Sequence, residues 1–206
     1  LDAACGVGTQ SLGSAPRSFE VVASDVSAGA LKRARREAEQ RGLAISFATA
    51  DMRSLASVHE PPFDVVIACD NSLPHLLGND EILLALRQMR ELLRPGGGCL
   101  ISVRDYDAVE RSGTHMFPYG VRTTPEGRVA VFQLWDFTDP RHYDLSMCFV
   151  HDFDRAPRAH VLRTRYQAIG LAELEGIFRE AGFEAVERIV DRFYQPVLVG
   201  TNPARS

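Results

Sequence analysis

Small and acidic residues in the first half of the chain suggest a ligand site. Residues 1–9 read Leu-Asp-Ala-Ala-Cys-Gly-Val-Gly-Thr. Such small residues let a backbone approach a ligand closely where a strand turns into a helix. Asp25 follows about 20 residues later, a position from which a carboxylate accepts hydrogen bonds from ribose hydroxyls. Asp51 could accept from an adenine amino group, with Met52 beside it as an apolar surface for the ring. Together these residues predict a site for an adenosine-containing ligand.

Each feature also has a structural interpretation. The glycine turn could be a tight connection without a ligand, Asp25 could cap the following helix, and Asp51 could be an exposed turn carboxylate. A dinucleotide fingerprint expects a third glycine at position 11, where this chain has Ser11. Ser11 therefore disfavours a nicotinamide or flavin cofactor.

Alternating apolar runs and helical patterns must position these residues. The expected strands are residues 1–3, 19–24, 45–49, 63–69 and 99–103. The expected helices are residues 28–41 and 80–93. This alternation is typical of βαβ units around a parallel sheet, where ligands bind outside the carboxyl ends of the strands. The polar residues at those ends are Asp2, Asp25, Asp51, the pair Asp70-Asn71 and the pair Arg104-Asp105.

The pattern changes after residue 104. Longer strands are expected at residues 129–137, 143–153 and 160–169, and we interpret residues 105–169 as an antiparallel β insertion. A helix at 172–181 and strands near 183–190 and 196–201 then resume the alternation. We predict a single domain over residues 1–206. Its fold class is α/β, a Rossmann-like doubly wound sheet of about seven strands with the last antiparallel, carrying this small β insertion.

Composition limits the function classes. The 206 residues suffice for one packed domain, and no apolar run approaches the roughly 20 residues of a membrane helix. A net charge of -4 gives no broad attraction for nucleic acid. The four cysteines form no C-x-x-C pair, and His142, His151 and His160 lack metal-ligand spacing, so neither a metal site nor a disulfide framework is expected.

These limits favour a cytoplasmic protein that acts on a small molecule, not on nucleic acid or at a membrane. The chain opens on its first motif without a Met, so we expect a further segment before Leu1. Whether the protein forms a homo-oligomer is left open.

Taken together, these residues resemble the class I S-adenosylmethionine-dependent methyltransferase family. LDAACGVG matches its first motif, Asp25 its acidic second motif, Ala50-Asp51-Met52 its adenine segment, and LLRPGG the stretch before its fifth strand. The resemblance covers about residues 1–103, with Ala4 where many members have glycine. It implies S-adenosylmethionine as cofactor and S-adenosylhomocysteine as product. The cofactor-binding residues that it implies are Asp2, Ala4, Gly6, Gly8, Asp25, Val26, Asp51, Met52, Cys69 and Asp70.

Two short segments look like the glycine/sarcosine N-methyltransferase-like subset of that family. Residues 69–76, Cys-Asp-Asn-Ser-Leu-Pro-His-Leu, are similar to its N-S-x-x-H-L segment, and residues 104–107, Arg-Asp-Tyr-Asp, to its R-N-Y-D segment. The resemblance implies that Asn71 and Arg104 bind an acceptor carboxylate. The antiparallel insertion at residues 105–169 resembles the strands with which these relatives cover the substrate, and Tyr166 is a further candidate for that wall of the site.

The chemistry suggests roles for these residues. A sulfonium methyl donor is already activated, so the protein must place an acceptor lone pair in line and exclude water. His75 could accept a proton from an amine, or be structural at the start of a helix. Arg104 could bind a carboxylate or pair with Asp105, Asp107 or Glu110. The candidate catalytic residues are His75, Arg104 and Tyr166, and the candidate substrate-binding residues are Asn71, His75 and Arg104.

The leading hypothesis is N-methylation of glycine or a related carboxylate-bearing amine. O-methylation of another small metabolite is an alternative within the same mechanism. A non-catalytic module that binds S-adenosylmethionine, and a nicotinamide-dependent oxidoreductase, are alternatives from other classes.

Overall fold

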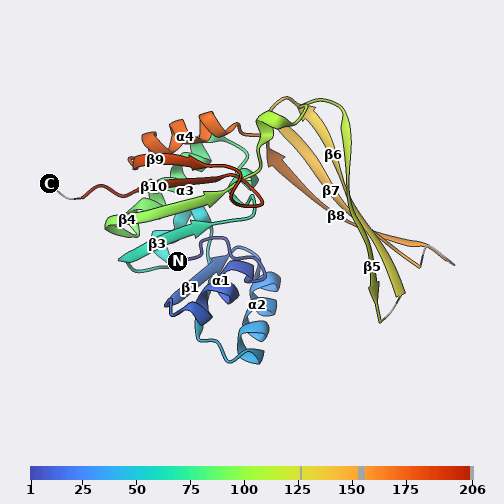
Figure 1. Ribbon diagram of the computed structural model, residues 1–206, viewed down its shortest axis with the longest axis horizontal. Helices are drawn as coiled ribbons and strands as arrows, with labels where there is room; N and C mark the ends of the chain where they lie inside the picture. The colour runs from blue at the N-terminus through green and yellow to red at the C-terminus, as the bar shows by residue number, and fades with distance from the viewer. Residues whose placement is uncertain (126, 153–155, 205–206) are drawn as a thin grey trace. The chain divides into compact units, whose positions relative to one another are not determined.

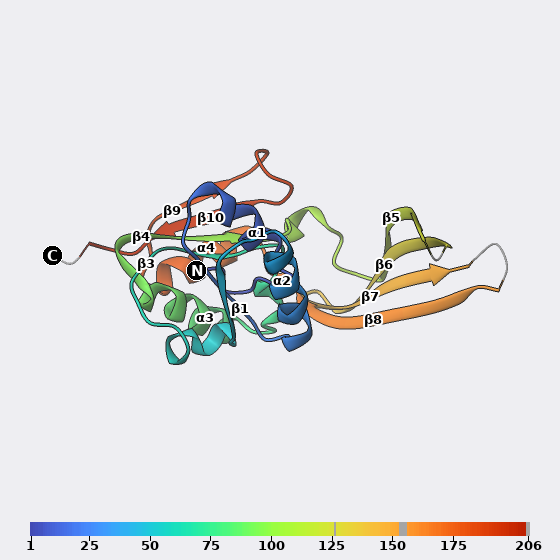
Figure 2. The same ribbon diagram turned by 90° about the horizontal axis from the view of Figure 1, so that it is seen from below.

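A computed structural model describes residues 1–125, 127–152 and 156–204 (Figures 1 and 2). The chain divides into two compact units. The first comprises Leu1–Asp105 with Gly170–Ser206, and the second comprises Tyr106–Ile169.

A mixed sheet forms the centre of the first unit (Figure 1). Its strands are β1 (Val21–Asp25), β2 (Ile45–Thr49), β3 (Phe63–Ala68), β4 (Leu93–Ser102), β9 (Glu184–Ile189) and β10 (Val197–Thr201). β1 pairs with β2 and β3 pairs with β4 in parallel, whereas β10 pairs antiparallel with both β4 and β9. Asp2 forms parallel bridges with Ala23 of β1 and Ile67 of β3, which join the two ladders. The resulting order is β2–β1–Asp2–β3–β4–β10–β9, a Rossmann-like α/β arrangement.

The α-helices of this unit are α1 (Thr9–Ser14), α2 (Ala28–Gln40), α3 (Asn79–Glu91) and α4 (Leu171–Glu180). Short 3₁₀ helices are η1 (Ala15–Arg17), η2 (Met52–Ser57) and η3 (Leu73–His75). α1 and α2 lie beside β1 and β2, while α3 and α4 lie beside β4 and β9 (Figure 1). α2 begins at an N-cap, Ser27, whose side chain accepts the Ala30 N–H, and its buried residues Leu31, Ala34 and Ala38 share one face. None of the helices described here is long and apolar enough to cross a membrane.

Several expected boundaries of the first unit shift by one or more residues, and the differences at residues 1–3 and 91–97 change an element. The strand expected at 1–3 consists of the Asp2 bridges alone. The helix expected to reach residue 93 ends at Glu91, and Pro95–Gly97 lie within β4 instead of forming the helix stop. The β3–β4 register shifts between Phe63 and Val65, so the proline and glycines are accommodated as an irregularity at the start of the strand.

An antiparallel sheet forms the second unit, in the order β5–β6–β7–β8. Its strands are β5 (Thr114–Thr124), β6 (Gly127–Asp139), β7 (His142–His151) and β8 (Arg158–Gln167), preceded by the 3₁₀ helix η4 (Tyr106–Ala108). The expectation of three strands was wrong because it missed β5. β5 is an edge strand whose register shifts between Pro118 and Gly120, and such residues obscure a strand pattern. The end expected for β7, residue 153, lies outside the described residues.

Aromatic side chains pack on one face of this second sheet. Trp135, which is 4% exposed, stacks on the fully buried Tyr143 with ring centroids 4.7 Å apart. Phe117 lies 4.3 Å from Trp135 and Tyr166 lies 5.4 Å from Tyr143, again between ring centroids. The hydroxyls of Tyr143 and Tyr106 are 2.9 Å apart. These rings form the apolar core of the unit.

Candidate functional site

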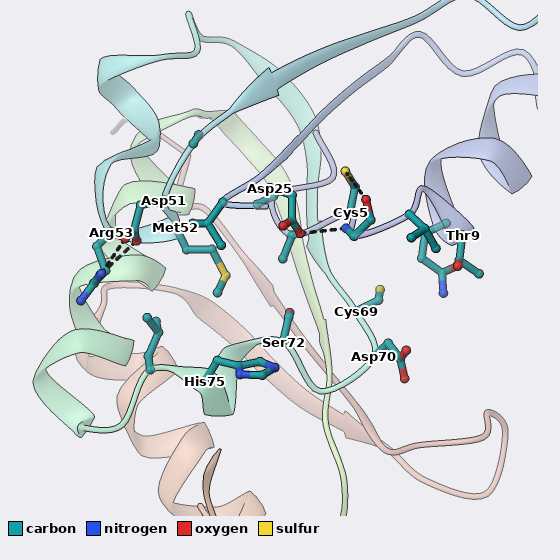
Figure 3. A pocket seen from close by; sticks show the side chains of 18 residues that line it. Cys5, Thr9, Asp25, Asp51, Met52, Arg53, Cys69, Asp70, Ser72 and His75 are labelled. Atoms are coloured by element: carbon teal, nitrogen blue, oxygen red, sulfur yellow. Dashed lines mark hydrogen bonds and ion pairs between the residues drawn. The ribbon is translucent and has the colours of Figure 1, made fainter. Parts of the chain in front are cut away.

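A cavity of about 530 Å³ lies at the carboxyl ends of the parallel strands in the first unit (Figure 3). Each part of its lining comes from a segment that follows the Asp2 bridge or a strand. The lining residues are Ala3–Val7, Thr9, Gln10, Asp25, Val26, Ala50–Arg53, Cys69, Asp70, Ser72, His75 and Leu76. The volume is that of a site for a small molecule or cofactor.

The glycine turn shapes one wall of the cavity. Gly6 has a φ of 53° and Gly8 a φ of 88°, a backbone conformation that residues with a Cβ rarely adopt. Gly6 lines the cavity, whereas Gly8 lies outside the lining as the residue before α1. A Cβ on Gly8 would lie 3.1 Å from the Cβ of Ala34 in α2. Gly8 therefore allows α1 and α2 to approach each other behind the cavity wall.

Asp25 links this turn to the start of α2. Its Oδ2 accepts the Gly6 N–H and its Oδ1 accepts the Ser27 N–H, each at 2.8 Å. Ser27, not Asp25, is the N-cap of α2. A carboxylate has about four acceptor sites, so both oxygens can accept further hydrogen bonds from a ligand hydroxyl in the cavity.

Asp51 is held by Arg53, a lining residue that the sequence analysis did not identify. The Arg53 Nη2 donates to Asp51 Oδ2 at 2.5 Å and its Nε donates to Oδ1 at 3.0 Å. Arg53 also donates from Nη1 to Glu81 Oε1 at 2.5 Å. The hydrogen bonds from Arg53 lower the pKa of Asp51 below its ordinary value. Asp51 therefore stays an anionic acceptor, which suits an amino-group donor.

Asp2 is not among the residues that line the cavity and is only 2% exposed. Its Oδ2 accepts the Ser11 hydroxyl at 2.6 Å, and burial raises its pKa while the Ser11 hydrogen bond opposes that rise. Ser11, at the position where a dinucleotide fingerprint has glycine, thus ties α1 to the centre of the sheet.

A tight turn after β3 forms the opposite side of the cavity. Asp70 and Asn71 have φ values of 57° and 63°, so two consecutive non-glycine residues are left-handed. Asp70 lines the cavity, and its N–H donates to the Ser102 hydroxyl at 2.7 Å. Asn71 is 2% exposed, and its Oδ1 accepts the backbone N–H of Arg104 at 3.0 Å. The Asn71 carboxamide thus positions the segment that carries Arg104.

His75 lines the cavity across from Asp25 (Figure 3). It is the last residue of η3, so the expectation that it starts a helix was wrong. The residue is exposed, yet the protein atoms around its ring lower its pKa. Asp25 acts against this shift and Arg104 adds to it. His75 is therefore neutral at physiological pH and can accept a proton.

Two cysteines line the cavity, but neither is a nucleophile. Burial raises the pKa of Cys69 to about 11 and that of Cys5 to about 12. Because the thiolate is the reactive form, both side chains are chemically inert thiols near neutral pH. The cavity therefore offers carboxylates, a neutral imidazole and backbone groups, and no activated thiol.

The structure brings most predicted cofactor residues into one cavity. Those in the lining are Ala4, Gly6, Asp25, Val26, Asp51, Met52, Cys69 and Asp70, while Asp2 and Gly8 lie behind it. Asn71 and Arg104 lie outside the lining, and Tyr166 belongs to the second unit. The roles predicted for these residues stay predictions.

The known proteins that this chain resembles are methyltransferases. A family model described as a methyltransferase domain matches residues 1–97. The glycine/sarcosine N-methyltransferase of Halorhodospira halochloris is 30% identical over 156 residues, which cover 71% of this chain and 58% of that protein. The chain therefore spans less than two thirds of that relative's length.

Solved structures share the fold. The CcbJ methyltransferase from Streptomyces caelestis aligns with a TM-score of 0.82 at 22% identity, covering 100% of this chain and 82% of that one. The S-adenosylmethionine-bound structure of CalS10, an amino pentose methyltransferase from Micromonospora echinaspora, aligns with a TM-score of 0.81 at 18% identity. That alignment covers 98% of this chain and 81% of that one.

Proposed function

Because this chain belongs to the class I S-adenosylmethionine-dependent methyltransferase family, we propose that it transfers a methyl group from S-adenosylmethionine to a small-molecule acceptor. The observation that carries this proposal is the single cavity in which the glycine turn meets Asp25 and Asp51. We also propose that the segment around Asp2 is the central strand of a seven-stranded sheet, because Asp2 bridges to both β1 and β3.

The residues present fit the cofactor. Asp25 can accept hydrogen bonds from ribose hydroxyls, Asp51 can accept from the adenine amino group, and Met52 provides an apolar contact. The small residues of the glycine turn leave room for the amino-acid portion beside the backbone. When bound, the cofactor supplies an activated methyl group. The protein then has to orient the acceptor, exclude water and take up the proton that an amine releases.

For the acceptor, we propose a small amine that carries a carboxylate, such as glycine. The similarity to a glycine/sarcosine N-methyltransferase supports this class. The guanidinium of Arg104 suits a carboxylate, and His75 in the cavity lining is a neutral base for the amine. Transfer would form a bond between the acceptor nitrogen and the methyl carbon and break the bond between that carbon and the sulfonium sulfur. His75 would take up the proton that the methylated ammonium releases.

Calorimetry on the protein tests the cofactor first. S-adenosylmethionine and S-adenosylhomocysteine should both bind with micromolar affinity, and neither NAD nor NADP should compete. Absence of binding would overturn the proposed function. Mass spectrometry then follows methyl transfer to glycine and sarcosine, with ethanolamine as the matched amine that lacks a carboxylate. Transfer to ethanolamine alone, or to a hydroxyl, would overturn the acceptor class. Binding without turnover of any acceptor would indicate a non-catalytic module.

The pH dependence of transfer tests His75. The imidazole accepts a proton only when neutral, and its pKa lies below the ordinary 6.5. We expect the contribution of His75 to kcat/KM to be constant above about pH 6.5 and to fall at lower pH. His75→Gln should lower kcat by about 10²-fold and remove this fall. His160→Gln, an exposed histidine on β8, is the control. An unchanged acid limb in His75→Gln would assign the titration to another group.

A further inference from the structure

The two left-handed residues after β3 need support from their surroundings. Residues with a Cβ disfavour positive φ, and both Asp70 and Asn71 adopt it. Neither is a glycine that would accept this conformation freely. Asp and Asn adopt this conformation more readily than other residues with a Cβ, but two such residues in succession are held more firmly where a neighbouring element accepts hydrogen bonds from the turn.

Ser102 provides that support from the adjacent strand. β3 and β4 pair in parallel with Ala68 opposite Ile101, which places Ser102 beside the start of the turn. The Ser102 hydroxyl accepts the Asp70 N–H at 2.7 Å, and its carbonyl accepts the Asn71 N–H at 3.1 Å. Both left-handed residues thus donate to one serine.

The hydroxyl of Ser102 is itself oriented by a second partner. It donates to Oε1 of Gln195 at 3.4 Å, and Gln195 is only 7% exposed. Gln195 precedes Pro196, whose carbonyl accepts the Val103 N–H at 3.0 Å. Gln195 in the segment before β10 therefore offers an acceptor to the hydroxyl hydrogen, while the hydroxyl oxygen accepts the Asp70 N–H. Only a side chain that both donates and accepts can bridge these two groups.

The turn contributes to the cavity lining and also holds the segment that carries Arg104. Asp70 lines the cofactor cavity, whereas Asn71 accepts the backbone N–H of Arg104 at 3.0 Å. A shift of the turn would therefore move a wall of the cavity and release the segment that carries Arg104. Ser102 lies outside the cavity lining, so any influence it has on ligands passes through the turn.

We propose that Ser102 is a positioning residue for methyl transfer: its hydroxyl and carbonyl hold the Asp70-Asn71 turn, and the turn sets the cavity wall and Arg104 together. The kinetic part of this inference rests on the proposed function. The hydrogen-bonding part does not, because it can be measured without a ligand.

Amide hydrogen exchange on the ligand-free protein tests the hydrogen bond directly. In the unsubstituted protein the Asp70 N–H should exchange more slowly than an exposed amide. Ser102→Ala should make it exchange about two- to tenfold faster, the loss expected for one hydrogen bond. Ser102→Thr, which keeps the hydroxyl, should restore the protection. Ser46→Ala, at an exposed serine on β2, is the matched control and should change nothing at Asp70.

Ligand measurements on the same variants test the positioning role. Ser102→Ala should raise the Kd of S-adenosylhomocysteine about two- to tenfold and raise the acceptor KM, with Ser102→Thr near the unsubstituted values. An unprotected Asp70 amide in the unsubstituted protein would overturn the inference even if Ser102→Ala fails to fold. So would unchanged Kd and KM in a folded Ser102→Ala. Failure of the unsubstituted protein to bind any cofactor would instead overturn the proposed function.

Discussion

Replacing Asp25 with alanine is expected to weaken binding of S-adenosylmethionine and S-adenosylhomocysteine by about 1–3 kcal/mol, or roughly 5- to 150-fold. Two losses add to this effect. The proposed hydrogen bonds to ribose hydroxyls disappear, and the N–H groups of Gly6 and Ser27 lose the acceptor that now lies 2.8 Å from each. Calorimetric titration of the purified variant measures the change.

Two further variants separate these losses. Asp25→Asn keeps one acceptor oxygen of the same shape and should fall between alanine and the unsubstituted protein. Asp80→Asn, an exposed carboxylate in the first turn of α3, removes the same charge outside the cavity lining and should leave affinity unchanged. Full affinity in a folded Asp25→Ala would remove Asp25 from the cofactor site.

Gly8→Ala is expected to lower the free energy of unfolding by roughly 1–3 kcal/mol. The alanine would have to adopt a φ near 88°, and its Cβ would lie 3.1 Å from the Cβ of Ala34. Strain and crowding therefore act together where α1 begins. Urea denaturation of the variant and the unsubstituted protein measures the difference.

Gly13→Ala is the matched control because Gly13 lies within α1, the helix that Gly8 precedes. Its φ is not positive, and an added Cβ would meet nothing within 4 Å. Alanine there should stabilise by about 0.5–1 kcal/mol through helix propensity. Because Ala34→Gly itself costs about 0.5–1 kcal/mol of helix propensity in α2, a double-mutant cycle with Gly8→Ala isolates the crowding part of the loss. Equal effects of Gly8→Ala and Gly13→Ala would contradict the role assigned to Gly8.

That these residues line one cavity was predictable because they follow strand ends in chain order. Asp25 is the last residue of β1, and Asp51 follows the end of β2. Parallel strands bring their carboxyl ends to one edge of a sheet. The pattern therefore identifies both carboxylates without knowledge of any contact. The same rule placed Asp2 in the site, although its side chain turns inward to Ser11. The alternation of strands and helices along the chain predicts which residues lie at one edge of the sheet, but not the direction in which each side chain points.

The contacts that hold the site could not be predicted in the same way. Ser102 and Asp70 are 32 positions apart, and their hydrogen bond depends on the register between β3 and β4. Arg53 is close to Asp51 in sequence, but its bond to Glu81 spans 28 positions. The hydrogen bond from the Arg104 backbone N–H to Asn71 Oδ1 likewise spans 33 positions. Side-chain roles of this kind follow from tertiary register, which residue types alone do not specify.

The chain has one tryptophan, and it belongs to the second unit. Trp135 is nearly buried and stacks on Tyr143, so its fluorescence will report the packing of the β5–β8 sheet. Far-ultraviolet circular dichroism reports both units. Transitions that coincide in urea would indicate one cooperative unit, whereas separate transitions would mean that the inserted sheet unfolds independently. A single tryptophan thus makes the stability of the insertion observable without any label, and cofactor should shift the two signals unequally if only one unit binds it.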